Sequence, residues 1–199
     1  MPDLLDDCGN ARLALKYERT TQTQVARRAT KETNTMLKQP VQDAINEQIK
    51  NELYSAYVYL SMSAHCEAVN LAGFAHWMRE QSREEVGHAM RLFDFVIDRG
   101  GRVVLEAIDK PPTEFKSPLD LAQQTLDHER RVTGMIDRLY ELAIQENDYA
   151  TQAQLQWFIT EQVEEEKSAS TILEQLKMVG DNRTALLMLD MELGKRAPE

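Results

Sequence analysis

Four stretches with helical periodicity each carry one glutamate on the stripe that should be apolar. These residues are Glu52, Glu85, Glu129 and Glu165, and His88 lies one turn beyond Glu85. A carboxylate that faces a helix-bundle core without a partner costs several kcal/mol, so four of them require a compensating positive charge. A pair of divalent metal ions is the simplest compensation. The feature therefore constrains both the fold, which must gather four helices around one point, and the chemistry at that point.

Apolar residues recur at three- and four-residue steps in four long segments, which predicts four amphipathic helices. Residues that favour helix ends mark their limits: Pro40, Gly100-Gly101, Pro118 and Gly180. The other side chains expected on the buried stripes are Ile45, Ile49, Ala56, Tyr59, Leu60, Phe74, Met78, Gln81, Leu92, Phe95, Leu119, Ala122, Leu126, Thr133, Ile136, Tyr140, Ala143, Leu155, Phe158, Gln162, Ala169, Ile172, Leu176 and Val179. A further helix, about Thr184–Leu193, is too short to be stable alone and must pack on a neighbour.

The connection between the second and third segments is long and rich in glycine and proline, which indicates a link without helix. Its 18 residues, 100–117, can reach about 60 Å, whereas a 28-residue helix is about 42 Å long. The link can therefore cross the whole bundle. The expected fold class is all-α, a four-helix bundle with one long crossover and a short fifth helix.

The glutamates and His88 have the composition of a two-metal site. Glu85 and His88 are three residues apart, so both side chains reach the same point beside one helix face. Four glutamates carry a charge of −4, which two divalent ions balance while the histidine stays neutral. Ligands of this kind, without thiolate, suit iron or manganese, with zinc as a competitor. An exposed face assigned to the wrong register, or a buried hydrogen-bond network, would be the alternative to a metal site.

Composition limits the other roles that this chain can have. A net charge of −10 argues against nucleic-acid binding and is compatible with attraction of cations. Two cysteines, Cys8 and Cys66, provide no disulfide framework and no CxxC site. With no secretory signal and no long apolar run, we expect a cytoplasmic protein without a membrane partner. Residues 1–39 carry a net charge of +2 and are weakly periodic, which indicates an extension outside the core.

Other residues that could carry chemistry have simpler interpretations. His65, His76 and His128 lie off the buried stripes, so we expect them at the surface or at its boundary. Cys66 is expected to be a small buried side chain. Tyr59 and Trp157 are interpreted as packing residues that lie near the metal site.

Residues 36–195 resemble the bacterial non-haem ferritins. Four sequence motifs carry the resemblance, one in each long helix: NEQIKNELYSAYVYLSMS, REEVGHAMRLFDFV, HER and LQWFITEQVEEEKSAS. The resemblance implies a ferritin-like bundle that assembles into a hollow homo-oligomeric shell of 24 subunits. It also implies ferroxidase activity, in which Fe(II) is oxidised with O2 or H2O2 and stored as a ferric mineral.

The resemblance also assigns roles to individual residues. Glu52, Glu85 and His88 match the ligands of a first iron. The ligands of the second iron are matched by Glu85, Glu129 and Glu165, and Glu85 would bridge the two irons. The remaining matches are Gln162 and Tyr59 beside the centre, and Glu84, Glu161 and Glu164 at an additional acidic iron site next to the seam positions.

Several residues differ from the motifs of related ferritin-like families, and these differences limit which of their properties can be expected here. Bacterioferritins have a histidine where this chain has Ser168 and a haem-binding methionine where it has Val86, so no haem is expected. The acidic channel residues of animal ferritins are replaced by Gln152 and Leu155, so their iron entry route cannot be transferred. The rubrerythrin CxxC domain is absent as well.

The expected organisation is an extension of unknown role, 1–35, followed by a ferritin-like di-iron domain, 36–199. Met36 resembles the usual start of such proteins, so translation from this residue is one interpretation of the extension. Two alternative functions remain open: a di-iron or iron/manganese oxidase or peroxidase that does not store iron, and a shell protein whose site has lost activity.

Overall fold

Helices make up most of residues 37–197, the part of the chain that this computed structural model describes. In this part they are α2 (Gln39–Ala68), α3 (Ala72–Asp98), α4 (Pro118–Gln145), α5 (Tyr149–Val179) and α6 (Arg183–Leu193), and no strand occurs among them. The expectation of an all-α bundle with a short additional helix is confirmed. The predicted extension, 1–35, lies outside the described residues.

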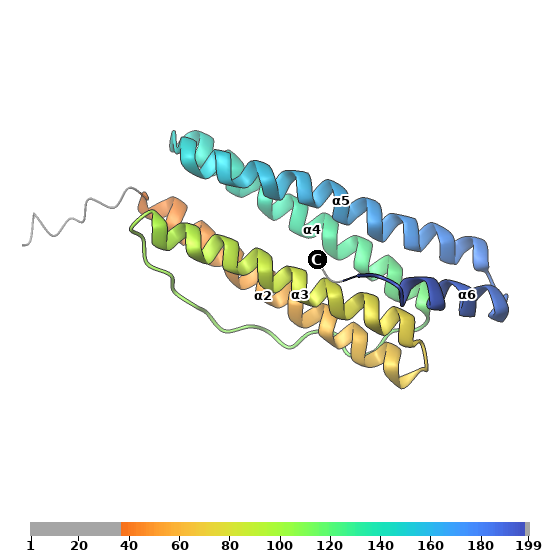
Figure 1. The fold of residues 1–199 in the computed structure, drawn as a ribbon. Coiled ribbons are helices and arrows are strands. Elements are labelled where there is room, and N and C mark those ends of the chain that lie inside the picture. Colours follow the sequence, from red (N-terminus) through yellow and green to blue (C-terminus); the bar gives the residue numbers. More distant parts are fainter. Residues whose placement is uncertain (1–36, 198–199) are drawn as a thin grey trace, which may run out of the picture. The chain divides into compact units, whose positions relative to one another are not determined.

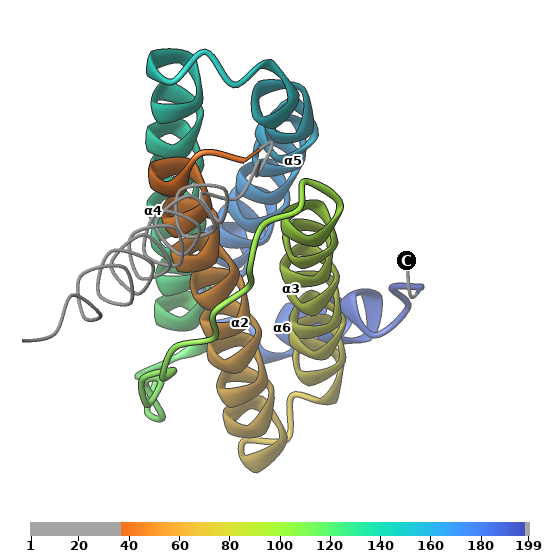
Figure 2. The same cartoon turned by 90° about the vertical axis from the view of Figure 1, so that its left-hand side faces the viewer.

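The long helices form two antiparallel pairs. Figure 1 shows α2 beside α3 and α4 beside α5, and the end-on view in Figure 2 shows the four helices arranged around a common axis. None of the described helices is long and apolar enough to cross a membrane.

Side chains at the helix ends explain where the helices start and stop. Ser117 and Asp148 each accept a hydrogen bond from the backbone amide three residues further on, at 3.1 and 3.0 Å, and so cap α4 and α5. Asp148 also pairs with Arg99 at the end of α3, through bonds of 2.9 and 3.1 Å. At the other end of α5, Gly180 has a φ of 53°, which favours glycine. Asn182 then caps α6.

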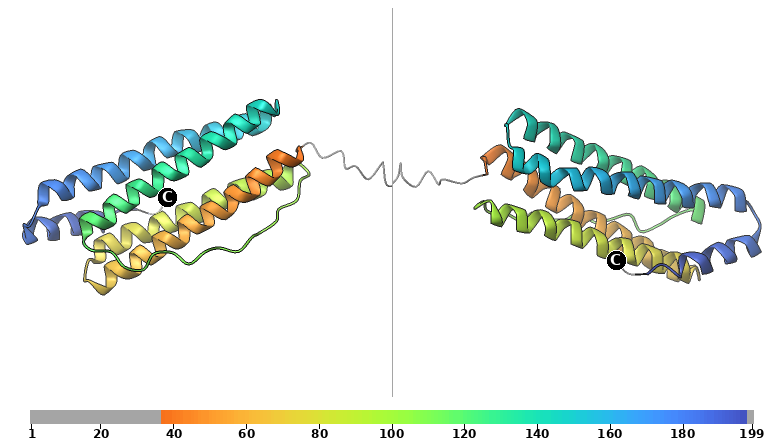
Figure 3. Two further views of the ribbon diagram at one scale, coloured as in Figure 1. Left: turned by 180° about the vertical axis from the view of Figure 1, so that it is seen from behind. Right: turned by 45° about the horizontal axis from the view of Figure 1, so that its top comes forward.

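The link between α3 and α4 runs along α2, as the rear view in Figure 3 shows. Near its start, Gln42 Oε1 accepts a hydrogen bond of 2.8 Å from the amide of Arg102, and Asn46 binds the same stretch of backbone. Near its end, Ser61 donates a bond of 2.6 Å to the carbonyl of Pro112. Since these contacts extend from one end of α2 towards the other, the link is the predicted crossover.

The apolar core is divided into two clusters by the layer that contains the glutamates. One cluster includes Tyr59, Phe74 and Leu126, and the other includes Ile49, Leu92 and Phe158. On every long helix the seam glutamate falls between a residue of one cluster and a residue of the other. The bundle therefore surrounds a polar layer at mid-height with apolar packing on both sides.

Three side chains differ from the expected exposure. His128 is buried, so its predicted place at the surface or boundary was wrong; its ring lies edge-on to Tyr59 and its Nε2 bonds to Ser55 at 2.8 Å. Leu60 and Leu119 are exposed rather than buried. Tyr59 takes the inward position at the corresponding turn of α2, and Leu119 lies in the first turn of α4, at the end of the bundle.

The short helix α6 is held against the start of α3. The Asp190 carboxylate accepts a hydrogen bond of 2.9 Å from the amide of Phe74, which satisfies one of the unpaired amides at that helix end. Gly73 allows the approach, because a Cβ at this position would lie 1.6 Å from the Asp190 carbonyl oxygen. The predicted need of the short helix for a packing partner is therefore met by α3.

We expect Gly73→Ala to destabilise the protein, although alanine is the better helix former. The added methyl group would force α6 away from α3, at a cost of about 1–3 kcal/mol. Gly87→Ala in the same helix is the matched control, because its Cβ would meet nothing within 4 Å; it should stabilise α3 by up to about 1 kcal/mol. Chemical unfolding of both variants measures the difference, and equal effects would contradict the described docking of α6.

Candidate metal centre

The four seam glutamates are brought into one buried layer, one from each long helix. Glu52 on α2, Glu85 on α3, Glu129 on α4 and Glu165 on α5 are 1%, 2%, 0% and 8% exposed. His88, one turn beyond Glu85 on α3, is also buried. Carboxylates so far removed from water need either a proton or a cation.

Two groups of side chains in this layer have the spacing of metal ligands. Glu52, Glu85 and His88 each offer a ligand atom, and these atoms all lie within 4.8 Å of one another. His88, Glu161 and Glu165 form the second such group. The first group is the predicted first iron site, whereas the second includes Glu161 in place of Glu85 and Glu129. The predicted ligand set of the second iron therefore stays a prediction.

One oxygen of Glu52 is left without a hydrogen bond inside the protein. Within residues 37–197, the Oε2 of Glu52 is one of only two buried side-chain polar atoms that have no partner. Its other oxygen accepts a bond of 2.9 Å from Gln48. A buried carboxylate oxygen that lies beside another carboxyl group and accepts no bond from an amide, a hydroxyl or a charged donor is the arrangement that a cation would complete. The residues present therefore fit a bound metal ion.

Amide and hydroxyl donors hold the remaining carboxylates in place. Gln81 donates to Glu165 at 2.7 Å, while Gln162 and the Tyr59 hydroxyl both donate to Glu129. Such outer contacts orient ligands and are a regular part of metal sites. Two of these glutamines had no role assigned from the sequence, Gln48 and Gln81. Each lies four residues before a seam glutamate on its own helix, which is the signal that could have identified them.

Burial determines the protonation of the site in the absence of metal. Burial raises the pKa of all four carboxyl groups, and repulsion from neighbouring glutamates adds to the effect. For Glu165 the pKa rises to about 8. Burial, together with the charge of Arg91, lowers the pKa of His88 to about 4, so its imidazole is neutral and able to bind metal. A metal ion entering at neutral pH must therefore displace protons from the carboxyl groups.

A groove of about 340 Å³ leads to this layer between α3 and α5. His88 and Glu161 line it, and so does Trp157, whose ring lies edge-on to His88 and under the guanidinium of Arg91. Since His88 is a candidate ligand, the groove opens beside one part of the candidate metal centre.

Two of the three residues of the predicted third iron site, Glu84 and Glu161, line this groove. Glu84 is paired with Arg196, with both carboxylate oxygens 2.6 Å from Nη2. Glu161 also offers a ligand atom close to those of His88 and Glu165, and Glu164 is exposed. This prediction remains a proposal, with Arg196 as a residue that the sequence had not indicated.

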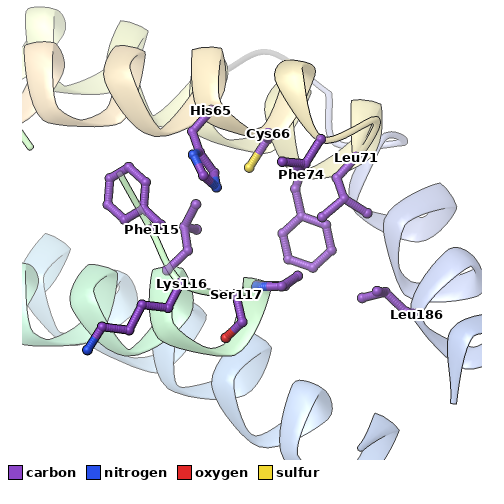
Figure 4. A pocket seen from close by; sticks show the side chains of 11 residues that line it. His65, Cys66, Leu71, Phe74, Phe115, Lys116, Ser117 and Leu186 are labelled. Atoms are coloured by element: carbon purple, nitrogen blue, oxygen red, sulfur yellow. The ribbon is translucent and has the colours of Figure 1, made fainter. Parts of the chain in front are cut away.

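Another pocket, of about 310 Å³, lies at the end of the bundle where α2, α4 and α6 meet (Figure 4). Phe74, Phe115 and Leu186 line it, with His65 and Cys66 at its wall. None of its lining residues is a candidate metal ligand, and burial raises the pKa of the Cys66 thiol to about 12. The pocket therefore offers no site for an organic substrate next to the glutamate layer.

Comparisons with known proteins agree with this arrangement. The family model of the ferritin-like domain matches residues 42–179. A bacterial non-haem ferritin of Bacteroides fragilis is 43% identical over 161 residues, which cover 81% of this chain and all of the relative. One from Staphylococcus epidermidis is 38% identical over 81% of this chain and 98% of its own. The crystal structure of an open-pore ferritin from the archaeon Archaeoglobus fulgidus superposes with a TM-score of 0.80 at 48% identity, covering 81% of this chain and 99% of that one. This chain belongs to the ferritin family and is similar, over most of its length, to the bacterial non-haem ferritins.

Proposed function

We propose that this protein stores iron, oxidising Fe(II) at the glutamate layer and depositing ferric mineral inside a shell built from copies of the same chain. The observation that carries the proposal is the convergence of four buried glutamates and His88, with an unpartnered oxygen on Glu52. The relatives named as bacterial non-haem ferritins support the same function.

The site residues have the properties that ferrous oxidation needs. Glu52, Glu85 and His88 would bind one ferrous ion, and Glu85, Glu129 and Glu165 the second, with Glu85 between them. Each Fe(II) gives up one electron, so two ions side by side would reduce one O2 to H2O2, or one H2O2 to two waters, and either reaction takes up two protons. Anionic oxygen ligands favour the ferric product over the ferrous substrate. Tyr59 and Gln162, which both donate to Glu129, orient this ligand.

The shell is a separate part of the proposal. Ferritins of known structure are similar to this chain over nearly their whole length, including the A. fulgidus open-pore ferritin. Leu187, Met188 and Met191 leave an apolar face exposed on α6, which is suited to contact between subunits. We infer a cytoplasmic homo-oligomer of 24 subunits.

Sedimentation before and after iron loading tests this function. With a subunit mass of 22.9 kDa, a 24-subunit shell has a mass of about 550 kDa. Aerobic Fe(II) should then yield particles of unchanged radius and greater density as mineral fills the interior. A stable dimer that oxidises iron and releases all of it would contradict storage and favour the oxidase alternative.

A further inference from the structure

The C-terminal segment after α6 runs along one face of α3 towards the metal centre. Asp190 binds the amide of Phe74 at the start of that face. Three residues beyond the end of α6, Arg196 reaches Trp77 and Gln81 further along. Because α6 is fixed by Asp190 and by the close approach at Gly73, the position of Arg196 is set by a docked helix.

Arg196 is held by several contacts at once. Its Nη2 donates to both oxygens of Glu84 at 2.6 Å, and its Nη1 donates to the Oε1 of Gln81. The guanidinium carbon lies 5.0 Å from the centre of the Trp77 ring. The carbonyl oxygen of Arg196 accepts a bond of 2.8 Å from the Nε2 of His76. Charge-assisted bonds of this kind are the stronger ones, so the guanidinium is a built part of the α3 surface.

The arginine is connected to the candidate metal ligands on two sides. Gln81, which accepts a bond from Arg196 through its oxygen, donates its amide group to Glu165 at 2.7 Å. Arg196 therefore fixes the orientation of the Gln81 amide, with the NH2 group turned towards the ligand. Glu84 directly precedes Glu85 in the sequence, so its carboxylate belongs to the acidic surroundings of the centre.

We propose that the guanidinium of Arg196 neutralises Glu84 beside the metal centre, in the place that a third metal ion would take. Such an ion can bind at Glu84 only by displacing the C-terminal segment. The inference rests on the proposed function and adds a specificity residue to it. A guanidinium on both carboxylate oxygens competes directly with an incoming ion. The two buried sites then fill first, and the third fills only at higher iron concentration.

Anaerobic calorimetric titration of the intact protein with Fe(II), and in parallel with Co(II), tests this inference. The wild-type protein should bind two ions per subunit tightly. Arg196→Gln should bind a third ion at least about tenfold more tightly than the wild-type protein does, because the competing charge is gone. Lys195→Gln is the matched control: it removes the same charge from the neighbouring residue, whose Nζ lies 2.6 Å from Glu192, and should behave as wild type.

Two further variants make the outcome decisive. Arg196→Gln combined with Glu84→Gln should lose the additional ion; if that ion persists, it does not bind at Glu84 and the proposal is wrong. Arg196→Lys keeps the charge and loses the bidentate contact with Glu84, so it should bind the third ion with an affinity between those of the wild-type protein and Arg196→Gln. It provides the same measurement if the glutamine variant does not fold.

The titration also separates this inference from the proposed function. If the wild-type protein and Arg196→Gln both bind only two ions per subunit, the proposed role of Arg196 is wrong and the two-metal site stands. No tight binding in the wild-type protein would overturn the proposed function itself.

Discussion

Replacing Glu52 or His88 by alanine is expected to remove the fast phase of ferrous oxidation. Both side chains belong to the group whose ligand atoms lie within 4.8 Å of one another, so either change takes a ligand from the first iron. Changes to outer-shell contacts of metal sites already cost about 10–100-fold in affinity or activity, and the loss of a ligand should reach at least the upper end of that range. Stopped-flow absorbance after mixing with Fe(II) and O2 measures the rate.

The controls for this prediction come from the same two residue types. Glu67→Ala changes an exposed glutamate on α2, and His65→Ala changes a histidine two residues earlier on the same helix that packs on Phe115. Both should oxidise iron at the wild-type rate. The fold of Glu52→Ala should survive, because the loss of a buried carboxylate relieves repulsion in the metal-free protein. Fast oxidation that persists in both Glu52→Ala and His88→Ala would show that the assigned site is wrong.

The metal-free protein is expected to lose stability as the pH rises from 6.5 to about 8. Burial raises the pKa of the seam carboxyls in the folded protein, and that of Glu165 reaches about 8. In the unfolded chain they lose their protons near the ordinary carboxyl value of 4.5. Across this window the folded protein binds more protons than the unfolded chain, so its stability falls as the pH rises.

Two buried histidines have the opposite effect, but only at lower pH. Burial lowers the pKa of His88 and His128 to about 4, from the ordinary value of 6.5. Between these values the unfolded chain holds the protons, so this contribution makes stability rise with pH and ends near pH 6.5. The change in stability above pH 6.5 therefore comes from the carboxyl groups.

Glu165→Gln should flatten this pH dependence by up to about 1.4 kcal/mol per pH unit, because one titrating proton is removed. Thermal unfolding of the metal-free protein at a series of pH values measures the slope. Glu164→Gln, the preceding residue and exposed, is the matched control and should keep the wild-type slope. Divalent metal should reverse the trend, since binding at the carboxylates displaces protons and strengthens with pH. A slope that is unchanged by Glu165→Gln would contradict the buried, protonated state of that carboxyl.

The fold could be predicted largely because its determinants are local. Periodic apolar positions and end signals such as Pro118 and Gly180 belong to single helices, and they located the helix limits to within a residue or two. The site followed from the same periodicity, because Glu52 and the other seam glutamates share the core-facing stripes. Its depth in the bundle also follows from the sequence, since the glutamates fall at similar positions along their helices.

The features that were missed depend on contacts between distant segments. His128 appeared to lie off the stripe, yet Ser55 and Tyr59 on α2 bury it. Arg196 comes from a segment with no strong pattern of its own, and only the docking of α6 on α3 brings it to Glu84. Such tertiary contacts leave no periodic signal in either partner, which is why they emerged only from the structure.

Anomalous diffraction at the iron edge, from crystals soaked anaerobically in Fe(II), tests the two-iron site most directly. Two peaks per subunit are expected in the glutamate layer. One should be bound by Glu52, Glu85 and His88, and the other by Glu85, Glu129 and Glu165. Iron found only on the outer surface, with the glutamate layer empty at saturating Fe(II), would contradict the assignment of this site as the centre of iron oxidation.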